Sequence, residues 1–254
     1  MLQQESSHLH QPERRGIPHI IHQIWYQGET QLPEKYRRFR NTWKKNHPDW
    51  KFVFWDEKNI RELVNREYAW FVSYFEGYPF DIQRMDSARY LILNSFGGFY
   101  IDMDVESFKP IDELLGDYEL ILSKTVTYNN AIMGSIPNHP LWQEVFNNLR
   151  KYYARPSPGR FELKKRFSAY YVGTSTGPRL LSRSVEEGRF DQQPTTRVCS
   201  GSFFEPDLPR EEGGRIIRSV DYSRAYARHH ADATGTFNQR EYDRQRTQIA
   251  ISRS

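Results

Sequence analysis

The acidic stretch Gly97-Gly98-Phe99-Tyr100-Ile101-Asp102-Met103-Asp104-Val105-Glu106 constrains the fold more than any other part of the chain. Read at a period of two, its apolar residues fall on one face of a strand and its carboxylates on the other. Carboxylates two residues apart, about 7 Å along a strand, repel each other. A divalent cation such as Mg²⁺ or Mn²⁺ would relieve this repulsion, because hard oxygen ligands suit these ions. A half-exposed strand with an acidic outer face is the alternative.

The segment before this stretch supports a binding site. Residues 81–96 are expected to form a helix that begins at an aspartate and ends at a glycine. Asp86 and Arg89 lie one turn apart within its apolar stripe, and charges on a buried helix face need a partner or a ligand. An internal salt bridge would also satisfy them. Because the helix runs directly into the acidic stretch, both features converge on one place, which favours the site.

The order of the expected elements indicates an α/β fold. Strands are predicted at 17–25, 50–55, 119–123, 129–135, 196–198, 203–204 and 226–230, and helices at 33–46, 56–64, 139–153 and 179–185. Strands that alternate with helices predict a mostly parallel central sheet with helices on both faces. Ligands bind at the carboxyl ends of the strands in such sheets.

Residues at the ends of other strands could contribute to this site. Trp25 ends the first strand, where it could be an aromatic platform for a nucleobase or a core tryptophan. His229 and His230 are adjacent and point to opposite faces of a strand, so they cannot both bind one metal. We expect His230, or Asp232 beyond it, to complete the shell of a cation; a surface histidine is the alternative.

Length and composition set bounds on the protein. The 254 residues suffice for one domain, which we assign to 16–237, with a flexible tail at 1–15 and a helix or tail at 238–254. The single cysteine, Cys199, excludes an internal disulfide and a cysteine-based zinc site. No apolar run approaches the roughly 18 residues of a membrane span, and residues 1–15 lack the apolar core of a signal peptide. We therefore expect a cytoplasmic protein, with peripheral membrane contact left open.

The pattern Asp86-x-x-Arg89 followed by Gly97-Gly98-x-Tyr100-x-Asp102-x-Asp104 resembles the signature of the DXD sugar-nucleotide glycosyltransferases of family 32. That family includes initiating mannosyltransferases and inositol-phosphoceramide mannosyltransferases, and the glucosylating clostridial toxins share its core pattern. The resemblance covers most of 17–232 and is strongest over 81–106. It implies the GT-A nucleotide-sugar fold and Mn²⁺ or Mg²⁺ as cofactor. It also implies transfer of a hexose, with retention, from a UDP- or GDP-linked donor such as GDP-mannose to a glycan or glycolipid acceptor.

The resemblance also implies roles for single residues. The implied catalytic residues are Asp86, Arg89, Asp102 and Asp104; the donor-binding residues are Trp25, Tyr100, Asn130, Asp86, Arg89 and Asp102; and the metal ligands are Asp102, Asp104, His230 and Asp232. A turn asparagine is the alternative for Asn130. The family often has a tryptophan shortly after its His-His pair, and residues 231–237 contain none, which leaves the acceptor contacts of this loop open.

Two other functions remain open from the sequence. A toxin-like enzyme would modify a protein acceptor, but the chain has no room for the large helical additions of those toxins. A non-catalytic basic module would bind nucleotides or nucleic acid, which the net charge of +4 would suit, but no nucleic-acid motif is present.

For the transferase itself, no second carboxylate can be nominated from the sequence as a covalent nucleophile. We therefore expect a front-face displacement.

Overall fold

A six-stranded sheet forms the centre of the protein. The computed structural model describes residues 16–153, 168–208, 210–212, 215–217 and 222–232. The strand order is β2-β1-β3-β6-β5-β7, and β6 is antiparallel to both of its neighbours while the others run parallel. In that order the strands span Lys51–Trp55, Ile20–Ile24, Gly98–Ile101, Ile132–Ser135, Leu120–Lys124 and Thr196–Ser200. The predicted α/β fold with a mostly parallel sheet is confirmed.

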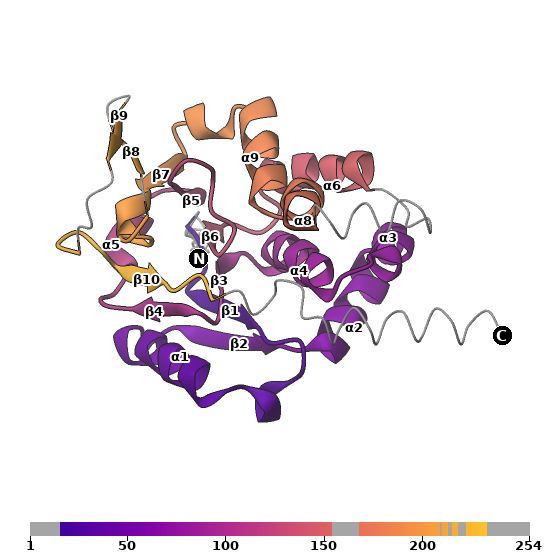
Figure 1. Ribbon diagram of the computed structural model, residues 1–254, viewed down its shortest axis with the longest axis horizontal. Coiled ribbons are helices and arrows are strands. Elements are labelled where there is room, and N and C mark those ends of the chain that lie inside the picture. The colour runs from indigo at the N-terminus through magenta and orange to yellow at the C-terminus, as the bar shows by residue number, and fades with distance from the viewer. Residues whose placement is uncertain (1–15, 154–167, 209, 213–214, 218–221, 233–254) are drawn as a thin grey trace, which may run out of the picture.

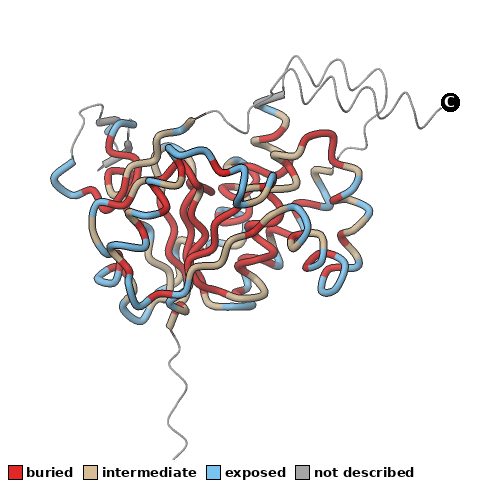
Figure 2. The backbone as a smooth tube through the Cα atoms, turned by 90° about the horizontal axis from the view of Figure 1, so that it is seen from below, coloured by how far each residue is buried: buried red, intermediate tan, exposed pale blue. Residues whose placement is uncertain are grey.

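Helices cover both faces of this sheet (Figure 1). On one face α1 and α5 pack against Ile21 and Phe99. On the other face α2, α3, α4, α6 and α9 pack against Tyr100 and Leu122. Figure 2 shows the buried backbone concentrated in the sheet and in the helical segments against it. The helices span Glu34–Asn46 (α1), Glu57–Glu67 (α2), Val72–Gly77 (α3), Asp81–Phe96 (α4), Asp112–Leu115 (α5), Pro140–Tyr152 (α6), Ser168–Ser175 (α8) and Pro178–Glu187 (α9).

Two smaller sheets lie outside the central one. β4 (Val105–Ser107) pairs antiparallel with β10 (Ala227–His229), and β8 (Arg210–Glu212) pairs antiparallel with β9 (Arg215–Ile217). The expected strand at 203–204 is wrong, because the chain there ends a short 3-10 turn that packs against Tyr226. The expected tails at 1–15 and 238–254 lie outside the described residues.

The junction between α4 and β3 needs its two glycines. Helix α4 spans the predicted residues and ends at Gly97, whose φ is +61°, and Gly98 follows with φ +83°. A Cβ on Gly98 would lie 2.5 Å from the carbonyl oxygen of Ile20 in β1. Only glycine combines a positive φ with this close approach. The junction therefore brings the helix and the acidic stretch against the first strand.

The alternation of apolar and acidic residues predicts one continuous strand, but the structure divides the acidic stretch into two strands. β3 ends at Ile101, the chain turns at 102–104, and β4 begins at Val105. The turn is held by a backbone bond from Val105 N–H to the Asp102 carbonyl at 3.2 Å, and Asp102 N–H donates to the Ala131 carbonyl at 2.8 Å. Asp102 and Asp104 therefore stand at a bend beyond the sheet, not along its face.

Within the described residues, no helix combines the length and the apolar character that crossing a bilayer requires.

His22 ties β1 to the glycine junction as a neutral imidazole. Its Nε2 lies 3.0 Å from the Gly97 carbonyl oxygen, to which it donates, and its Nδ1 accepts from Trp55 Nε1 at 3.1 Å. Burial lowers the pKa of His22 from 6.5 to about 4. A histidine with a depressed folded-state pKa stabilises the fold fully above its unfolded pKa, and this stability is lost as the pH falls.

We expect the free energy of unfolding to fall by about 3 kcal/mol between pH 7 and pH 4 through His22 alone. Urea unfolding across this range should show a shallower pH dependence in His22→Gln than in the wild type. Burial also lowers the pKa values of His47 and His139, but these two residues add the same pH dependence to the unfolding of both proteins. The same substitution at exposed His19 is the control. Identical pH profiles for wild type and His22→Gln would contradict the assignment.

Candidate active site

Eight of the nine site residues predicted from the sequence meet at a cavity of about 460 Å³, and His230 is the exception. It lies beyond the carboxyl ends of β1 and β3, between α4, the start of α9 and the residues that follow β10. This is the edge of the sheet at which α/β proteins bind their ligands. The predicted residues that line the cavity are Trp25, Asp86, Arg89, Tyr100, Asp102, Asp104, Asn130 and Asp232.

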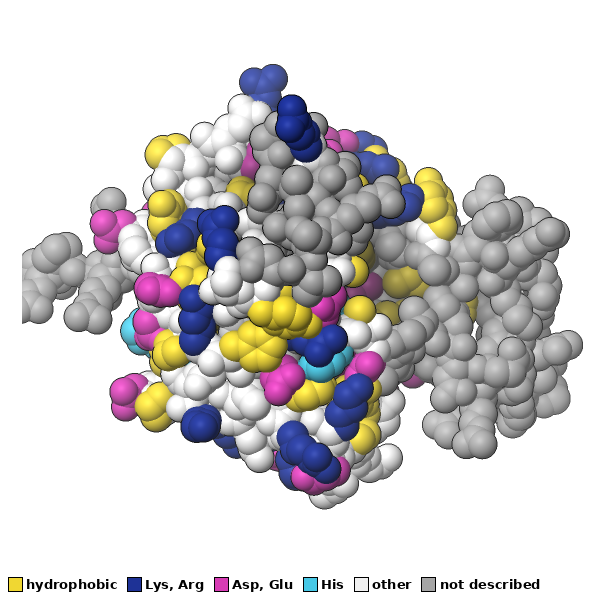
Figure 3. Space-filling model, turned by 60° about the vertical axis from the view of Figure 1, so that its left-hand side comes forward, with side chains coloured by type: hydrophobic (Ala, Val, Ile, Leu, Met, Phe, Trp, Pro, Cys, Tyr) yellow, Lys and Arg dark blue, Asp and Glu magenta, His cyan; other side chains and the backbone are white. Residues whose placement is uncertain are grey.

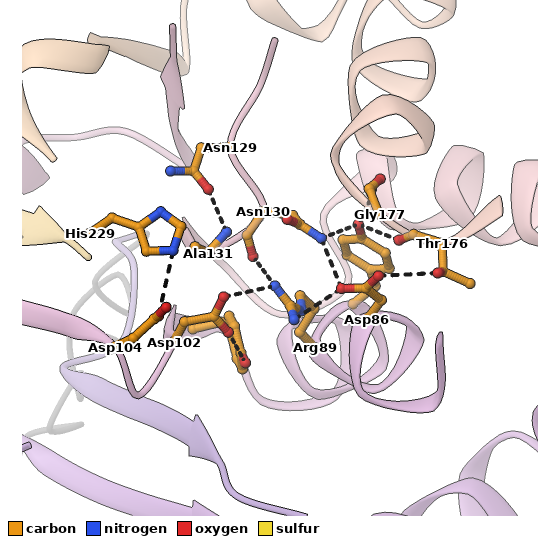
Figure 4. A network of polar contacts seen from close by, with 12 residues as sticks. Asp86, Arg89, Asp102, Asp104, Asn129, Asn130, Ala131, Thr176, Gly177 and His229 are labelled. Atoms are coloured by element: carbon orange, nitrogen blue, oxygen red, sulfur yellow. Dashed lines mark hydrogen bonds and ion pairs between the residues drawn. The ribbon is translucent and has the colours of Figure 1, made fainter. Parts of the chain in front are cut away.

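Arg89 connects Asp86 in α4 with Asp102 in the turn after β3 (Figure 4). Its Nη2 lies 3.0 Å from Asp86 Oδ1, and its Nη1 lies 3.3 Å from Asp102 Oδ2 and donates to the Asn130 carbonyl at 2.7 Å. Asp86 also accepts from Asn130 Nδ2 and from Thr176 Oγ1, each at 3.1 Å. Asp86 and Arg89 are almost fully buried. The internal salt bridge therefore exists, and it forms part of the cavity wall.

The partners of Asp86 define what this carboxylate can still bind. Burial raises its pKa to about 6, against the opposing effect of Arg89. Among the residues that the structure describes, Oδ1 accepts from Arg89 and Asn130, whereas Oδ2 accepts only from Thr176. A carboxylate offers about four acceptor positions, so Oδ2 has one left. Gly177 keeps the space beside it open, since a Cβ there would lie 3.3 Å from Asp86 Oδ2.

Asp102 is supported from the protein side. The hydroxyl of Tyr100 donates to its Oδ1 at 2.5 Å, and the guanidinium of Arg89 lies 4.7 Å from the centre of the Tyr100 ring. Burial raises the pKa of Asp102, and Arg89 opposes this shift. Tyr100 is only 1% exposed, whereas the side chain of Asp102 is 25% exposed. Tyr100 therefore orients Asp102, whose carboxylate faces the cavity.

Asp102, Asp104 and His229 form a group that could hold a metal ion. One ligand atom from each lies within 4.8 Å of the others, and His229 Nε2 is 3.5 Å from Asp104 Oδ1. Burial lowers the pKa of His229, but its contacts with Asp104 and Glu205 outweigh this and raise it to about 10. Surroundings that favour positive charge so strongly also suit a cation, and the donor set of two carboxylates and one imidazole fits a divalent transition metal.

The structure brings His229, not His230, to the acidic pair. His230 Nε2 lies 3.1 Å from Glu106 Oε2, and its ring stacks on Phe39 with centroids 4.4 Å apart. Asp232 does line the cavity, but its carboxylate contacts Lys35, and its backbone N–H donates to Asp104 Oδ2 at 2.9 Å. The alternation of side chains places the two histidines on opposite sides, as expected, and the one nearer to Asp104 is His229.

Trp25 forms the wall of the cavity beside β1. Its half-buried ring packs against Tyr36, with centroids 5.3 Å apart. Within the described part of the chain its Nε1 has no hydrogen-bond partner. Trp25 and Tyr36 both line the cavity, so an aromatic surface is available to a planar group. Its use as a nucleobase platform stays a prediction.

Two further residues complete the network. Thr176 bonds Asp86, and Glu205 bonds His229 Nδ1 at 3.2 Å. Thr176 belongs to the Thr-Gly-Pro segment before α9, a pattern that the sequence alone indicates as a candidate anion-binding turn. Glu205 follows a 3-10 turn and carries no such pattern.

Comparisons with known proteins agree with this geometry. Residues 33–121 match the family described as a glycosyltransferase sugar-binding region containing the DXD motif. The chain therefore contains a sugar-binding region of the DXD glycosyltransferase family. The predicted resemblance and the predicted glycosyltransferase class are thus confirmed at the level of the family.

Curated relatives carry mannosyltransferase names. Inositol phosphoceramide mannosyltransferase 1 of Schizosaccharomyces pombe is 36% identical over 148 residues, which cover 56% of this chain and 46% of that protein. Mannosyl phosphorylinositol ceramide synthase SUR1 of Saccharomyces cerevisiae is 32% identical over 200 residues, which cover 76% of this chain and 49% of that protein. The chain therefore spans about half the length of these relatives.

Solved structures share the fold. The PaToxG glycosyltransferase superposes with a TM-score of 0.51 at 15% identity, covering 70% of this chain and 71% of that one. The ligand-free glycosyltransferase domain from the YGT toxin superposes with a TM-score of 0.50 at 10% identity, covering 72% and 80%. At these identities the likeness shows the fold alone, and the predicted GT-A fold is confirmed.

The buried ion pair makes a prediction about stability. Arg89→Met should lower the free energy of unfolding by about 3–5 kcal/mol, because it leaves the buried Asp86 without its cation. The matched control is Arg66→Met, which removes an exposed Arg from a surface pair with Glu67 and should change stability little. Denaturant unfolding of both variants measures the difference. Equal stabilities for Arg89→Met and Arg66→Met would refute a structural role for Arg89.

Proposed function

We propose that the protein transfers a hexose from a nucleotide sugar to a glycan or glycolipid acceptor, with retention of anomeric configuration. The observation that carries this proposal is the convergence of Asp86, Arg89, Asp102 and Asp104 on one cavity at the carboxyl edge of the sheet. The names of the relatives support mannose as the sugar and inositol phosphoceramide as the first acceptor to test. The donor is a UDP- or GDP-linked hexose.

Asp102, Asp104 and His229 are the residues that would hold a divalent cation. When bound, such a cation supplies Lewis-acid stabilisation of the negative charge on the diphosphate leaving group. The imidazole in the donor set favours Mn²⁺ over Mg²⁺, since Mg²⁺ prefers oxygen ligands alone.

The remaining polar residues would bind and orient the sugar. The free acceptor position on Asp86 Oδ2 suits a sugar hydroxyl, because a hydroxyl can donate one bond there. Arg89 lines the cavity, keeps Asp86 and Asp102 in place and stays charged itself. Asn130 is bonded to Asp86 through Nδ2, so its amide positions the carboxylate. A rigid acceptor array of this kind aligns the donor for attack.

The same contacts support a front-face displacement. A covalent nucleophile needs a carboxylate oxygen that is free to attack the anomeric carbon. Asp86 Oδ1 already accepts two hydrogen bonds, and the acceptor position left on Oδ2 is the one that we assign to a sugar hydroxyl. Asp102 and Asp104 belong to the candidate metal group. The acceptor hydroxyl would therefore attack from the side that the nucleotide leaves.

One face of the protein bears on the alternative of a nucleic-acid module. On the face shown in Figure 3, Lys and Arg side chains are interspersed with Asp and Glu and do not form a continuous basic stripe. Binding to a phosphate backbone would need such a stripe. This face therefore does not favour nucleic-acid binding.

Asp104→Ala should lower the turnover of a sugar nucleotide by at least about 100-fold, the usual loss when one group that stabilises transition-state charge is removed. The assay incubates the protein with Mn²⁺ and a panel of UDP- and GDP-linked hexoses and measures the nucleotide released, without acceptor and then with inositol phosphoceramide. Addition of EDTA to the wild type should abolish release to the same extent.

Asp49→Asn, an exposed acid in the turn before β2, is the control and should keep wild-type turnover. A thermal melt verifies that Asp104→Ala remains folded. Wild-type turnover in folded Asp104→Ala would overturn the proposed function.

A further inference from the structure

His229 is held by a second carboxylate on the side away from Asp104. Its Nδ1 lies 3.2 Å from Glu205 Oε1, while its Nε2 faces Asp104 Oδ1 at 3.5 Å. Glu205 is 6% exposed, and within the described residues its Oε2 has no hydrogen-bond partner. A buried glutamate therefore stands next to a site that already contains two aspartates. Such a placement is unfavourable by charge alone.

Docking of β10 does not need this contact. The turn before Glu205 and β10 are joined through the backbone, since Tyr226 N–H donates to the Phe203 carbonyl at 2.7 Å and His229 N–H donates to the Phe204 carbonyl at 2.9 Å. Glu205 N–H closes its own turn on the Gly201 carbonyl at 2.7 Å. The carboxylate is thus free to act on the imidazole ring, while the backbone bonds hold the two segments together.

The arrangement matches a recurring feature of metal sites. A histidine that binds a metal usually donates its other ring N–H to a carboxylate, which fixes the tautomer and the ring orientation. With Nδ1–H directed at Glu205, it is Nε2 of His229 that faces Asp104 and the candidate metal group, and a cation bound there would displace the Nε2 proton.

We propose that Glu205 is a positioning residue that holds His229 with its proton on Nδ1 and its Nε2 available to the cation. This inference rests on the proposed function, because it assumes that a cation binds between Asp102, Asp104 and His229. Glu205 does not touch the cation in this arrangement; it acts through the imidazole. No pattern in the sequence connects Glu205 with His229, which follows it 24 positions later.

The neighbouring histidine provides a matched control. His230 Nε2 lies 3.1 Å from Glu106 Oε2, so Glu106 and His230 form a carboxylate–imidazole pair of the same kind. This pair lies outside the candidate metal group. Glu106→Gln therefore removes an equivalent charge close to the site without affecting the ring of His229.

The test titrates the full 254-residue chain with Mn²⁺, followed by electron paramagnetic resonance of the free ion. Glu205→Ala should weaken Mn²⁺ binding by about 10–100-fold. Glu205→Gln should weaken it less, because an amide oxygen still accepts from Nδ1–H, and Glu106→Gln should stay within about threefold of the wild type. Nitrogen-15 NMR of the imidazole with diamagnetic Zn²⁺ added, an ion that imidazole binds well, should show the proton of His229 on Nδ1 in the wild type and a mixture of tautomers in Glu205→Ala.

The outcomes separate this inference from the function on which it rests. If His229→Gln loses Mn²⁺ affinity while folded Glu205→Ala binds like the wild type, the positioning role is wrong and the metal site stands. If the wild type, His229→Gln and Asp104→Ala all fail to bind Mn²⁺, or bind it equally, the metal site is wrong and the inference falls with it. If Glu205→Ala does not fold, Glu205→Gln decides: the wild-type tautomer with weakened binding supports the inference, and unchanged affinity for Mn²⁺ refutes it.

Discussion

The buried guanidinium of Arg89 is the interaction on which the site depends. It bonds Asp86 in its own helix, Asp102 in the acidic turn and the carbonyl of Asn130 before β6. Three segments of the chain are thereby fixed around one charge. An arginine suits this place better than a lysine, because its planar group offers several donors in fixed directions and stays charged when buried. The cavity floor and the stability of the fold consequently rest on the same contacts.

The acidic turn depends in addition on a segment from the far end of the domain. After β10 pairs with β4, the N–H of His230 donates to the Asp104 carbonyl at 3.0 Å, and the N–H of Asp232 donates to its Oδ2. The last contact joins residues 128 positions apart. The geometry of Asp104 is therefore complete only when the whole described domain has folded, whereas Asp86 and Arg89 are brought together by one turn of α4. Asp102 connects the two parts of the site, because it bonds Arg89 of the local pair and lies two residues before Asp104 in the same turn.

This difference explains which features were predictable from the sequence. Helix α4 and its end at Gly97 follow from local propensities, and both were predicted correctly. The strand through 98–106 was predicted too long, because alternation does not reveal where a partner strand begins. β6 starts at Ile132 opposite Ile101, and after one more backbone bond, from Asp102 N–H to the Ala131 carbonyl, the chain turns instead of continuing the ladder. The choice between His229 and His230 likewise depended on which face of β10 meets Asp104, and this is a property of tertiary pairing.

The three aspartates at the cavity show that partners, more than residue type, assign chemical roles. Asp86 is enclosed by three donors, and burial raises its pKa to about 6, so it suits recognition of a hydroxyl. Asp102 shares Arg89 with it but keeps a more exposed carboxylate, oriented by Tyr100. The carboxylate of Asp104 accepts from the backbone N–H of Asp232 and faces His229. A motif of two aspartates specifies none of this by itself. The three aspartates differ because each has different neighbours. Asp86 lies in α4, Asp102 follows the end of β3, and Asp104 is contacted by residues in and after β10.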